Sequence, residues 1–435
     1  AQINATGTIA SVALDIDFKY AVYIGLISIL LCSMLGGMRA VTWTQVAQYI
    51  VLIIAYLLPI FWISNKMGAG FFPHFMLADE VARIGELEAQ FGFVKNSAAD
   101  LASVPKGLAG ITKAHSAVNA TPWAFISLAL AMMMGTASLP HVMMRYFTTP
   151  SVKAARKSVG WSLFFIFLLY SSAPMLATLS KLSLIDPTLP TGIIGKTFAE
   201  VQAIDWYQNW NQANLMFISD FNGNGTLELN EFFMGGKAVV LATPEIAGLP
   251  YVISGLVAAG GMAAAMSTAD GLILAIANAI SHDVYYKMID PKAETAKRLV
   301  VARVLLVVIG FAGATIAAMQ IQGILGSVIW AFDFAMSGLF FPLVLGVWWK
   351  RANREGAIAG MALGLASAIW YLVWVRTGGS GFLGITQLTF GIFGAAVSLV
   401  SMVVVSLMTS APNAATQKMV DEVRIPSGRS IVGKQ

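Results

Sequence analysis

The chain has 435 residues, of which 57% are hydrophobic and only 11% are charged. Soluble domains carry about 25% charged residues, so this composition excludes an ordinary soluble protein and favours one that is solvated mainly by lipid. The net charge of +5 would suggest nucleic-acid binding in a soluble chain, but in a membrane protein it is typical of basic cytoplasmic loops. The single cysteine, Cys32, lies in an apolar run, which excludes a disulfide framework and a thiol-ligated metal.

Nine apolar segments follow a polar opening stretch, residues 1–17, which we interpret as a loop within a longer protein. Each segment is close to the ~20 residues that cross a bilayer. The predicted spans are residues 18–36, 41–64, 122–146, 157–180, 249–282, 298–320, 322–349, 355–376 and 386–409. The third span is interrupted at residues 135–140 (GTASLP), which predicts either a break that lines a cavity or a simple kink.

Basic residues are concentrated in alternate loops, after the first, third, fifth, seventh and ninth spans. They are Arg39; Arg145, Lys153, Arg156 and Lys157; Lys287, Lys292, Lys297 and Arg298; Lys350, Arg351 and Arg354; and Lys418, Arg424, Arg429 and Lys434. By the positive-inside rule these loops face the cytoplasm. We therefore expect an integral protein of the cytoplasmic (inner) membrane. Its long loops, 65–121 and 181–248, would be extracytoplasmic and its tail, 410–435, cytoplasmic.

The fifth span carries Ser267, Thr268 and Asp270 at membrane depth. Polar groups are costly in hydrocarbon, so they usually lie on an ion or substrate path. Alternatively, the two hydroxyls bond back to the preceding turn of their own helix. Asp270 likewise has two interpretations, a cation ligand or the partner of a basic group at the cytoplasmic mouth.

The long loop 181–248 contains the pattern of a calcium-binding EF-hand loop over residues 220–231. Oxygen-bearing side chains fall at loop positions 1, 3, 5, 9 and 12, with Gly225 at the sixth position and the Thr226 carbonyl at the seventh. These side chains belong to Asp220, Asn222, Asn224, Glu228 and Glu231. The pattern predicts a calcium ion that braces the outer loop; the alternative is a polar surface turn.

Several motifs resemble signatures of the sodium:solute symporter family. They are GGMRAVTWTQVAQYI (36–50), GTASLPHVMMRYF (135–147), AAAMSTADG (263–271), SHDVYYK (281–287) and FFPLVLGVWWKRANREGAIAG (340–360). The stretches TASLPHVMMRYFTTPSVKAARKSV (136–159) and SHDVY most resemble the branch of acetate and short-chain monocarboxylate permeases. The calcium-loop insertion is not a general feature of this family.

The resemblance implies an all-α polytopic membrane protein with a leucine-transporter-type core, in which two inverted five-helix repeats hold solute and sodium near the midplane. The implied divisions are the last two helices of the first repeat (1–64), an extracytoplasmic loop (65–121), the second repeat (122–349) with the insertion 181–248, two peripheral helices (350–409) and the tail (410–435). The first three helices of the first repeat would then lie outside this sequence, on another part of the full-length protein.

The resemblance also places sodium on the fifth span. Ser267 and Thr268 match the family's adjacent hydroxyl pair, and Ala264 matches the position that supplies a backbone carbonyl. Many relatives carry an acidic residue where this chain has Gln45, whereas here Asp270 stands in place of a hydroxyl on the neighbouring helix. We therefore predict a second cation site at Asp270 and Gln45.

The substrate pathway is predicted at the break in the third span, with Gly135, Thr136 and Ser138, and at Asp333 of the seventh span. Asp333 could be a gate, a protonatable group or a substrate contact. A bare carboxylate would repel an anionic solute. If the solute is a carboxylate, Asp333 should therefore be protonated, paired or outside the pocket.

The implied function is sodium-coupled symport of a small organic solute, a short-chain monocarboxylate such as acetate, by alternating access. The expected partners are this solute, sodium and membrane lipid, without nucleic acid. No nucleophile–base pair or metal-ligand cluster occurs at membrane depth, so an enzyme is not expected. The alternative is a transporter-like solute sensor or regulatory subunit, for which the short stretch 410–435 leaves no room for a signalling domain.

Overall fold

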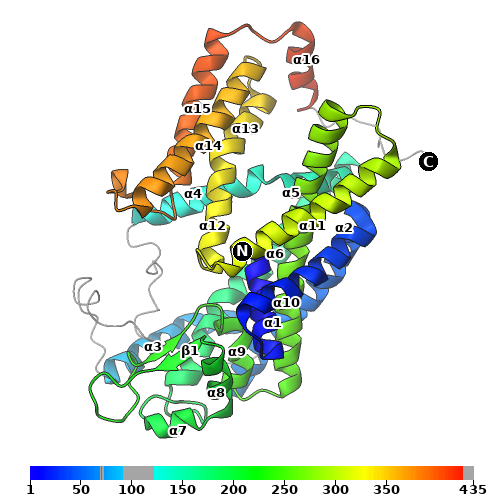
Figure 1. The fold of residues 1–435 in the computed structure, drawn as a ribbon. Coiled ribbons are helices and arrows are strands. Elements are labelled where there is room, and N and C mark those ends of the chain that lie inside the picture. Colours follow the sequence, from blue (N-terminus) through cyan, green and yellow to red (C-terminus); the bar gives the residue numbers. More distant parts are fainter. Residues whose placement is uncertain (69, 71–72, 92–121, 425–435) are drawn as a thin grey trace. The chain divides into compact units, whose positions relative to one another are not determined.

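The computed structural model describes residues 1–435 except 69, 71–72, 92–121 and 425–435 (Figure 1). Parts of the predicted outer loop 65–121 and of the predicted tail 410–435 therefore lie outside the described residues. The chain divides into two compact units. The larger unit comprises residues 2–113 and 160–321, and the smaller comprises residue 1, 114–159 and 322–435.

The described residues confirm the all-α polytopic fold. Seven helices are long and apolar enough to cross a membrane, or up to nine spans if two sharply bent helix pairs each count as one. The long helices are α2 (Phe18–Lys66), α6 (Val152–Ile185), α10 (Tyr251–Asn278), α11 (Thr295–Ala318), α12 (Ile324–Ala335) with α13 (Phe341–Trp348), α14 (Arg354–Arg376) and α15 (Gly391–Met408). Short π-helical segments extend α10 (η4, Ala279–Ile289) and join α12 to α13 (η5, Met336–Phe340).

Helix α2 contains both of the first two predicted spans. It is kinked at Gly37, whose φ of +58° lies in the left-handed region. A glycine adopts this conformation without a steric penalty, whereas a side chain would strain it. The kink divides α2 between the predicted spans 18–36 and 41–64.

The polar opening stretch is a helix, so its interpretation as a loop was wrong. Helix α1 (Gln2–Leu14) packs against α2 and α10, and its middle is buried. The buried hydroxyls donate within the helix itself, Thr6 to the Ile3 carbonyl and Thr8 to the Asn4 carbonyl. This local bonding makes polar residues compatible with a buried helix. With the first part of α2, α1 forms one of the two bent pairs, at 112°.

The core of the larger unit lies between α2, α10 and α11. Buried residues of the three helices pack together, among them Leu26 and Ile29 of α2, Ile273 and Leu274 of α10, and Leu306 of α11. Further along, a Cβ on Gly260 of α10 would collide with the side chain of Ala55 in α2. The two helices therefore cross closely, which brings the polar positions of α10 against α2.

A compact subdomain, comprising α3 (Leu77–Gln90) and residues 186–248, lies at one end of the larger unit's long helices (Figure 1). We call it the outer subdomain after the side predicted for its loops. It contains α7 (Phe198–Gln202), α8 (Asp205–Gln212), α9 (Val239–Ile246) and the antiparallel strands β1 (Met216–Ile218) and β2 (Phe232–Met234), in which Met216 is opposite Met234. Its buried core includes Ile84 of α3, Trp210 of α8 and Phe232 of β2. The ion pairs Glu88–Lys181 and Arg83–Asp186 also attach α3 to the end of α6 and the residue that follows it.

The smaller unit contains the predicted broken span and the last helices of the chain. Helix α4 (Pro122–Ser138) ends where Leu139 becomes extended, with φ −69° and ψ 119°; α5 (Pro140–Met143) and the 3-10 turn η3 (Met144–Thr148) follow. The resulting 49° bend confirms the interruption. Helices α14 and α15 lie side by side (Figure 1), and the short helix α16 (Ala414–Glu422) follows them.

Candidate functional site

The predicted sodium ligands lie in the middle of α10. The Ser267 hydroxyl donates to the Ala264 carbonyl at 2.9 Å, so two of the three predicted oxygens are in contact. Thr268, the third, is the next residue and is half-buried. This hydrogen bond to the preceding turn of its own helix is one of the two alternatives that the sequence allowed for the Ser267 hydroxyl. It leaves lone pairs on both oxygens that can still face a cation.

Gln45, from the second half of α2, reaches the same turn of α10. Its side chain is buried, and its Nε2 donates to the Ser267 carbonyl. The Gln45 amide therefore lies one turn from Asp270. The structure thus places Gln45 against the stretch of α10 that carries Asp270.

Asp270 is fully buried and contacts the first half of α2. Its Oδ1 accepts a hydrogen bond from the Ser33 hydroxyl at 3.1 Å, whereas its Oδ2 has no hydrogen-bond partner among the described residues. The side chain of Arg39 lies outside the described part of the chain, so the alternative of a basic partner for Asp270 stays a prediction.

Residues on both sides of Gly37 in α2 therefore contact the segment 264–270 of α10. Ser33 was missed by sequence reasoning, because a serine in an apolar run can equally bond to its own helix. The arrangement offers hydroxyl, carbonyl and carboxylate oxygens, which are the donors that hard cations prefer. It can hold a small cation near a single buried negative charge.

The residues predicted for the substrate pathway lie in the smaller unit. Gly135 packs directly on α12, since a Cβ there would come within 2.6 Å of the Phe332 carbonyl oxygen. The hydroxyls of Thr136 and Ser138 donate to carbonyls of α4 itself, at 2.6 Å to Met132 and 2.9 Å to Met134. At the break, these two hydroxyls are therefore hydrogen-bonded within α4 itself.

Asp333 is fully buried and directed towards α15. A Cβ on Gly391, the first residue of α15, would collide with the Asp333 carboxylate. Neither carboxylate oxygen has a hydrogen-bond partner of good geometry among the described residues. The N-terminus of a helix carries partial positive charge, which favours a carboxylate beside it. The Asp333 carboxylate therefore lies beside the N-terminus of α15. This position fits an electrostatic interaction with that helix better than a contact with the solute.

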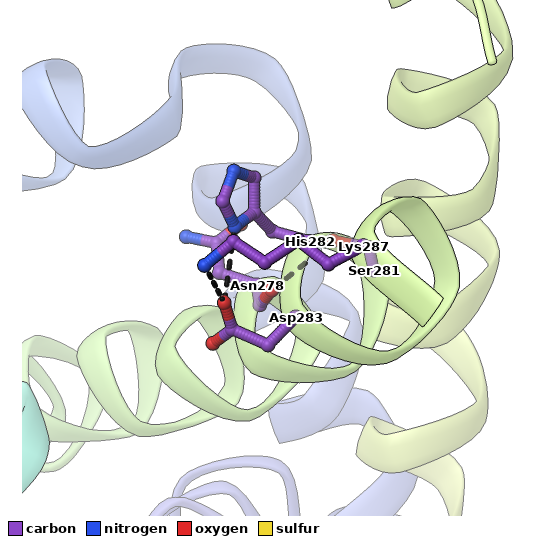
Figure 2. Close-up of polar contacts among 5 residues, drawn as sticks. All are labelled: Asn278, Ser281, His282, Asp283 and Lys287. Carbon is purple, nitrogen blue, oxygen red and sulfur yellow. Dashed lines mark hydrogen bonds and ion pairs between the residues drawn. The ribbon is translucent and has the colours of Figure 1, made fainter. Parts of the chain in front are cut away.

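The SHDVYYK stretch forms η4, the π-helical extension of α10. Figure 2 shows His282 and Lys287 directed towards the carboxylate of Asp283. Lys287 Nζ lies 2.9 Å from Asp283 Oδ1, and His282 Nδ1 lies 3.1 Å from it. All three side chains are more than half exposed, so this cluster marks the charged end of α10.

The twelve-residue loop 220–231 is closed by its first and last acidic residues. Asp220 accepts from the amides of Gly223 (2.7 Å) and Gly225 (3.0 Å), and Glu231 accepts from those of Phe221 (2.9 Å) and Glu228 (3.0 Å). Gly225 has a φ of +72°, as a sharp turn at the sixth position requires.

The oxygens of this loop are ligands of the kind that calcium prefers, but they are not arranged as a metal centre in this structure. The Asn222 and Asn224 amide nitrogens each donate to Glu228 Oε1 at 2.9 Å. Across the described residues, no three His, Cys, Asp or Glu side chains converge in a group that could hold a metal ion. Calcium binding therefore stays a prediction.

Long apolar helices, a broken span and buried polar groups on a central helix define a polytopic membrane transporter. The model of the sodium:solute symporter family matches residues 1–184 and 237–364, and the chain belongs to this family. It is therefore a transporter rather than an enzyme. The match omits residues 185–236, the segment that carries the EF-hand-like loop.

The proteins similar to the chain include two curated proteins and one solved structure. An uncharacterized symporter of Cupriavidus necator is 34% identical, over 94% of this chain and 72% of that protein. A protein of Corynebacterium glutamicum named monocarboxylic acid transporter is 27% identical, over 85% of this chain and 59% of that protein. A structure described as the substrate-bound outward-open state of a Na⁺-coupled sialic acid symporter superposes with a TM-score of 0.57 at 17% identity. It covers 95% of this chain and 73% of that one. This last likeness establishes the shared leucine-transporter-type fold.

Proposed function

We propose that the protein is a sodium-coupled symporter of short-chain monocarboxylates such as acetate. The observation that carries the proposal is the pair of contacts between α2 and the polar turn of α10, from Ser33 to Asp270 and from Gln45 to Ser267. Family membership supports sodium coupling, and the printed name of the Corynebacterium relative supports a monocarboxylate solute.

In this proposal the principal sodium ion binds at Ala264, Ser267 and Thr268, and a second cation binds at Asp270 and Gln45. The Asp270 carboxylate keeps one negative charge near both sites, which attracts the cations to α10 and offsets the repulsion between them. Gly135, Thr136 and Ser138 contribute to the solute path through the backbone at the helix break.

The two halves of α2 would be the last helices of the first inverted repeat, and α4 to α13 would form the second. The basic loops would face the cytoplasm and the outer subdomain the opposite side of the inner membrane. Within the outer subdomain, the loop 220–231 would bind calcium as a structural brace, with the Asn222 and Asn224 amides turning their oxygens towards the ion. The closure of this loop by Asp220 and Glu231 supports that part of the proposal.

The test is uptake of labelled acetate, pyruvate or propionate into proteoliposomes that contain the full-length protein. We expect an inward sodium gradient to drive accumulation, and its replacement by a potassium gradient to abolish it. Protein-free liposomes give the background. Uptake that a proton gradient drives equally well without sodium would overturn the coupling, and uptake of neutral solutes only would overturn the solute class.

A further inference from the structure

An outer cavity of about 460 Å³ lies in the larger unit, separate from the cation site of α10. Its walls come from the end of α1 and the turn after it, from α8 and α9 of the outer subdomain, and from the first turns of α10. Two acidic side chains line it, Asp15 and Glu245, and no lysine, arginine or histidine does. The cavity therefore attracts cations and repels anions.

The two acids occupy different depths of this outer cavity. Asp15 is exposed, and both of its carboxylate oxygens accept from Gln212 Nε2, at 3.1 and 3.3 Å. Glu245 is half-buried, and its Oε2 accepts from the indole Nε1 of the buried Trp210 at 2.9 Å. The indole bond fixes the Glu245 carboxylate while leaving Oε1 for another donor.

A second polar group that lines the same cavity, on α10, has no hydrogen-bond partner among the described residues. The Ser254 hydroxyl oxygen is buried in the wall of the cavity and makes no hydrogen bond with the described residues. A buried hydroxyl without a partner costs about 1–3 kcal/mol, which a ligand in the cavity would recover. Burial also raises the pKa of the Glu245 carboxyl, against the opposing effect of the Trp210 bond, so a nearby positive charge would stabilise its ionised form.

Apart from Asn209, the remaining lining is apolar and includes Ile9, Leu241 and Ala258. A bare sodium ion needs several oxygen ligands at short range, whereas the side-chain oxygens of this lining are divided among α8, α9, α10 and the turn after α1, and no metal-ligand group of acidic side chains forms among the described residues. A primary ammonium has three N–H donors and can use both Glu245 and Ser254, while an attached alkyl chain fills the apolar part. The size and lining therefore favour an organic cation over a metal ion.

We propose that this outer cavity binds a small organic ammonium, with its charge on Glu245 and Ser254 and its apolar part against α1, α9 and α10. The site joins the outer subdomain to two helices of the larger unit. Its occupant therefore stabilises their packing, in addition to any sodium or carboxylate bound elsewhere. The inference does not depend on which solute is transported.

The probe is butylammonium, added to the purified full-length protein in detergent at constant ionic strength while the melting temperature is recorded. Butyrate and butanol serve as the anionic and neutral analogues of the same size, and sodium chloride controls for cations in general. We expect a saturable rise in melting temperature with butylammonium only, because a ligand that binds the native state stabilises it by mass action.

Glu245→Gln should weaken butylammonium binding at least about tenfold, while keeping an acceptor for Trp210. Asp205→Asn, an exposed acid on the same outer subdomain and outside the cavity, is the matched control and should bind normally. Ser254→Ala retains the charge and should weaken binding by a smaller factor, which keeps the test open if Glu245→Gln does not fold. An equal shift with butanol or sodium, or unchanged binding in Glu245→Gln and Ser254→Ala, would overturn the proposal.

Discussion

The hydrogen bond between Ser33 and Asp270 is the contact that links the first half of α2 to the proposed cation site. It is made by a hydroxyl to a fully buried carboxylate. Hydrogen bonds to charged groups contribute about 1.5–3 kcal/mol, and their loss leaves the charge less solvated. We therefore propose that the Ser33 hydroxyl positions Asp270 for a cation.

Ser33→Ala should raise the sodium concentration needed for half-maximal uptake about tenfold, which corresponds to about 1.4 kcal/mol. The half-saturating solute concentration at saturating sodium should change much less. Ser171→Ala is the matched control, because the Ser171 hydroxyl bonds only to the Leu168 carbonyl of its own helix. Equal effects of the two substitutions on sodium dependence would show that Ser33 has no special role.

Individual residues could be predicted only where a motif marks them. Ser267 and Asp270 stand out because polar residues in a long apolar span are costly. In contrast, Ser33 has no distinguishing neighbour in the sequence. Its role depends on the kink at Gly37 and on the close crossing at Gly260, which together decide which face of α2 meets α10. Packing between helices of this kind cannot be read from one sequence.

At the scale of the element, the attachment of α3 depends on a buried ion pair. Glu88 and Lys181 are both almost completely buried, with exposed side-chain fractions of 3% and 6%. Removing one member of such a pair leaves an uncompensated charge, at a cost on the order of 3–5 kcal/mol. The pair therefore contributes strongly to the attachment of α3 to α6.

Glu88→Gln should lower the melting temperature of the purified protein markedly, whereas Glu86→Gln should leave it nearly unchanged. Glu86 is exposed on the same helix, and such surface changes are usually within about 0.5 kcal/mol. The comparison is made by thermal unfolding in one detergent. Similar melting temperatures for the two variants would mean that the ion pair contributes nothing to the attachment of α3.

A second prediction at the scale of the element concerns the EF-hand-like loop 220–231. Glu231 is fully buried and accepts two backbone amides, so Glu231→Gln should destabilise the loop even without metal. The informative quantity is the rise in melting temperature on adding ~10 mM calcium, a concentration that would saturate sites of the weak extracellular class. We expect this rise in the native protein, its loss in Glu231→Gln, and unchanged solute affinity in both. No calcium-dependent rise in the native protein would leave the motif as a polar turn.

A helix or a helix break could be predicted from the sequence where a single physical property of the residues determines it. The break before Pro140 follows from residues that favour turns, and the structure places it at Leu139. Helix α1 was misread because Asn4, Thr6 and Thr8 look like loop residues, although the two threonine hydroxyls donate within the helix and the Asn4 side chain accepts from Lys237. The outer subdomain could not be predicted beyond its calcium motif, since its short helices and strands are defined by packing around Trp210 and Phe232.

At the scale of the whole molecule, the distribution of charge determines the proposed orientation. Basic residues follow alternate spans, whereas the outer subdomain carries the acidic loop 220–231 and Glu245 of the outer cavity. Composition and hydropathy were enough to predict a polytopic membrane protein, because lipid imposes long apolar helices on any such chain, whereas the transporter class came from the polar residues of the fifth span and the family resemblance. Which spans pack together within each unit could be determined only from the structure.

The orientation can be tested with single cysteines. The native Cys32 is half-buried and would first be replaced by Ser. In this background, Asp205→Cys places a thiol on the exposed surface of the outer subdomain, and Lys292→Cys places one after η4 in a basic loop. The positive-inside rule predicts that an impermeant maleimide added to right-side-out spheroplasts labels the first variant directly and the second only after permeabilisation. The Cys32→Ser background without new cysteines gives the baseline. The opposite labelling pattern would place the outer subdomain in the cytoplasm and would contradict both the orientation and the role proposed for calcium.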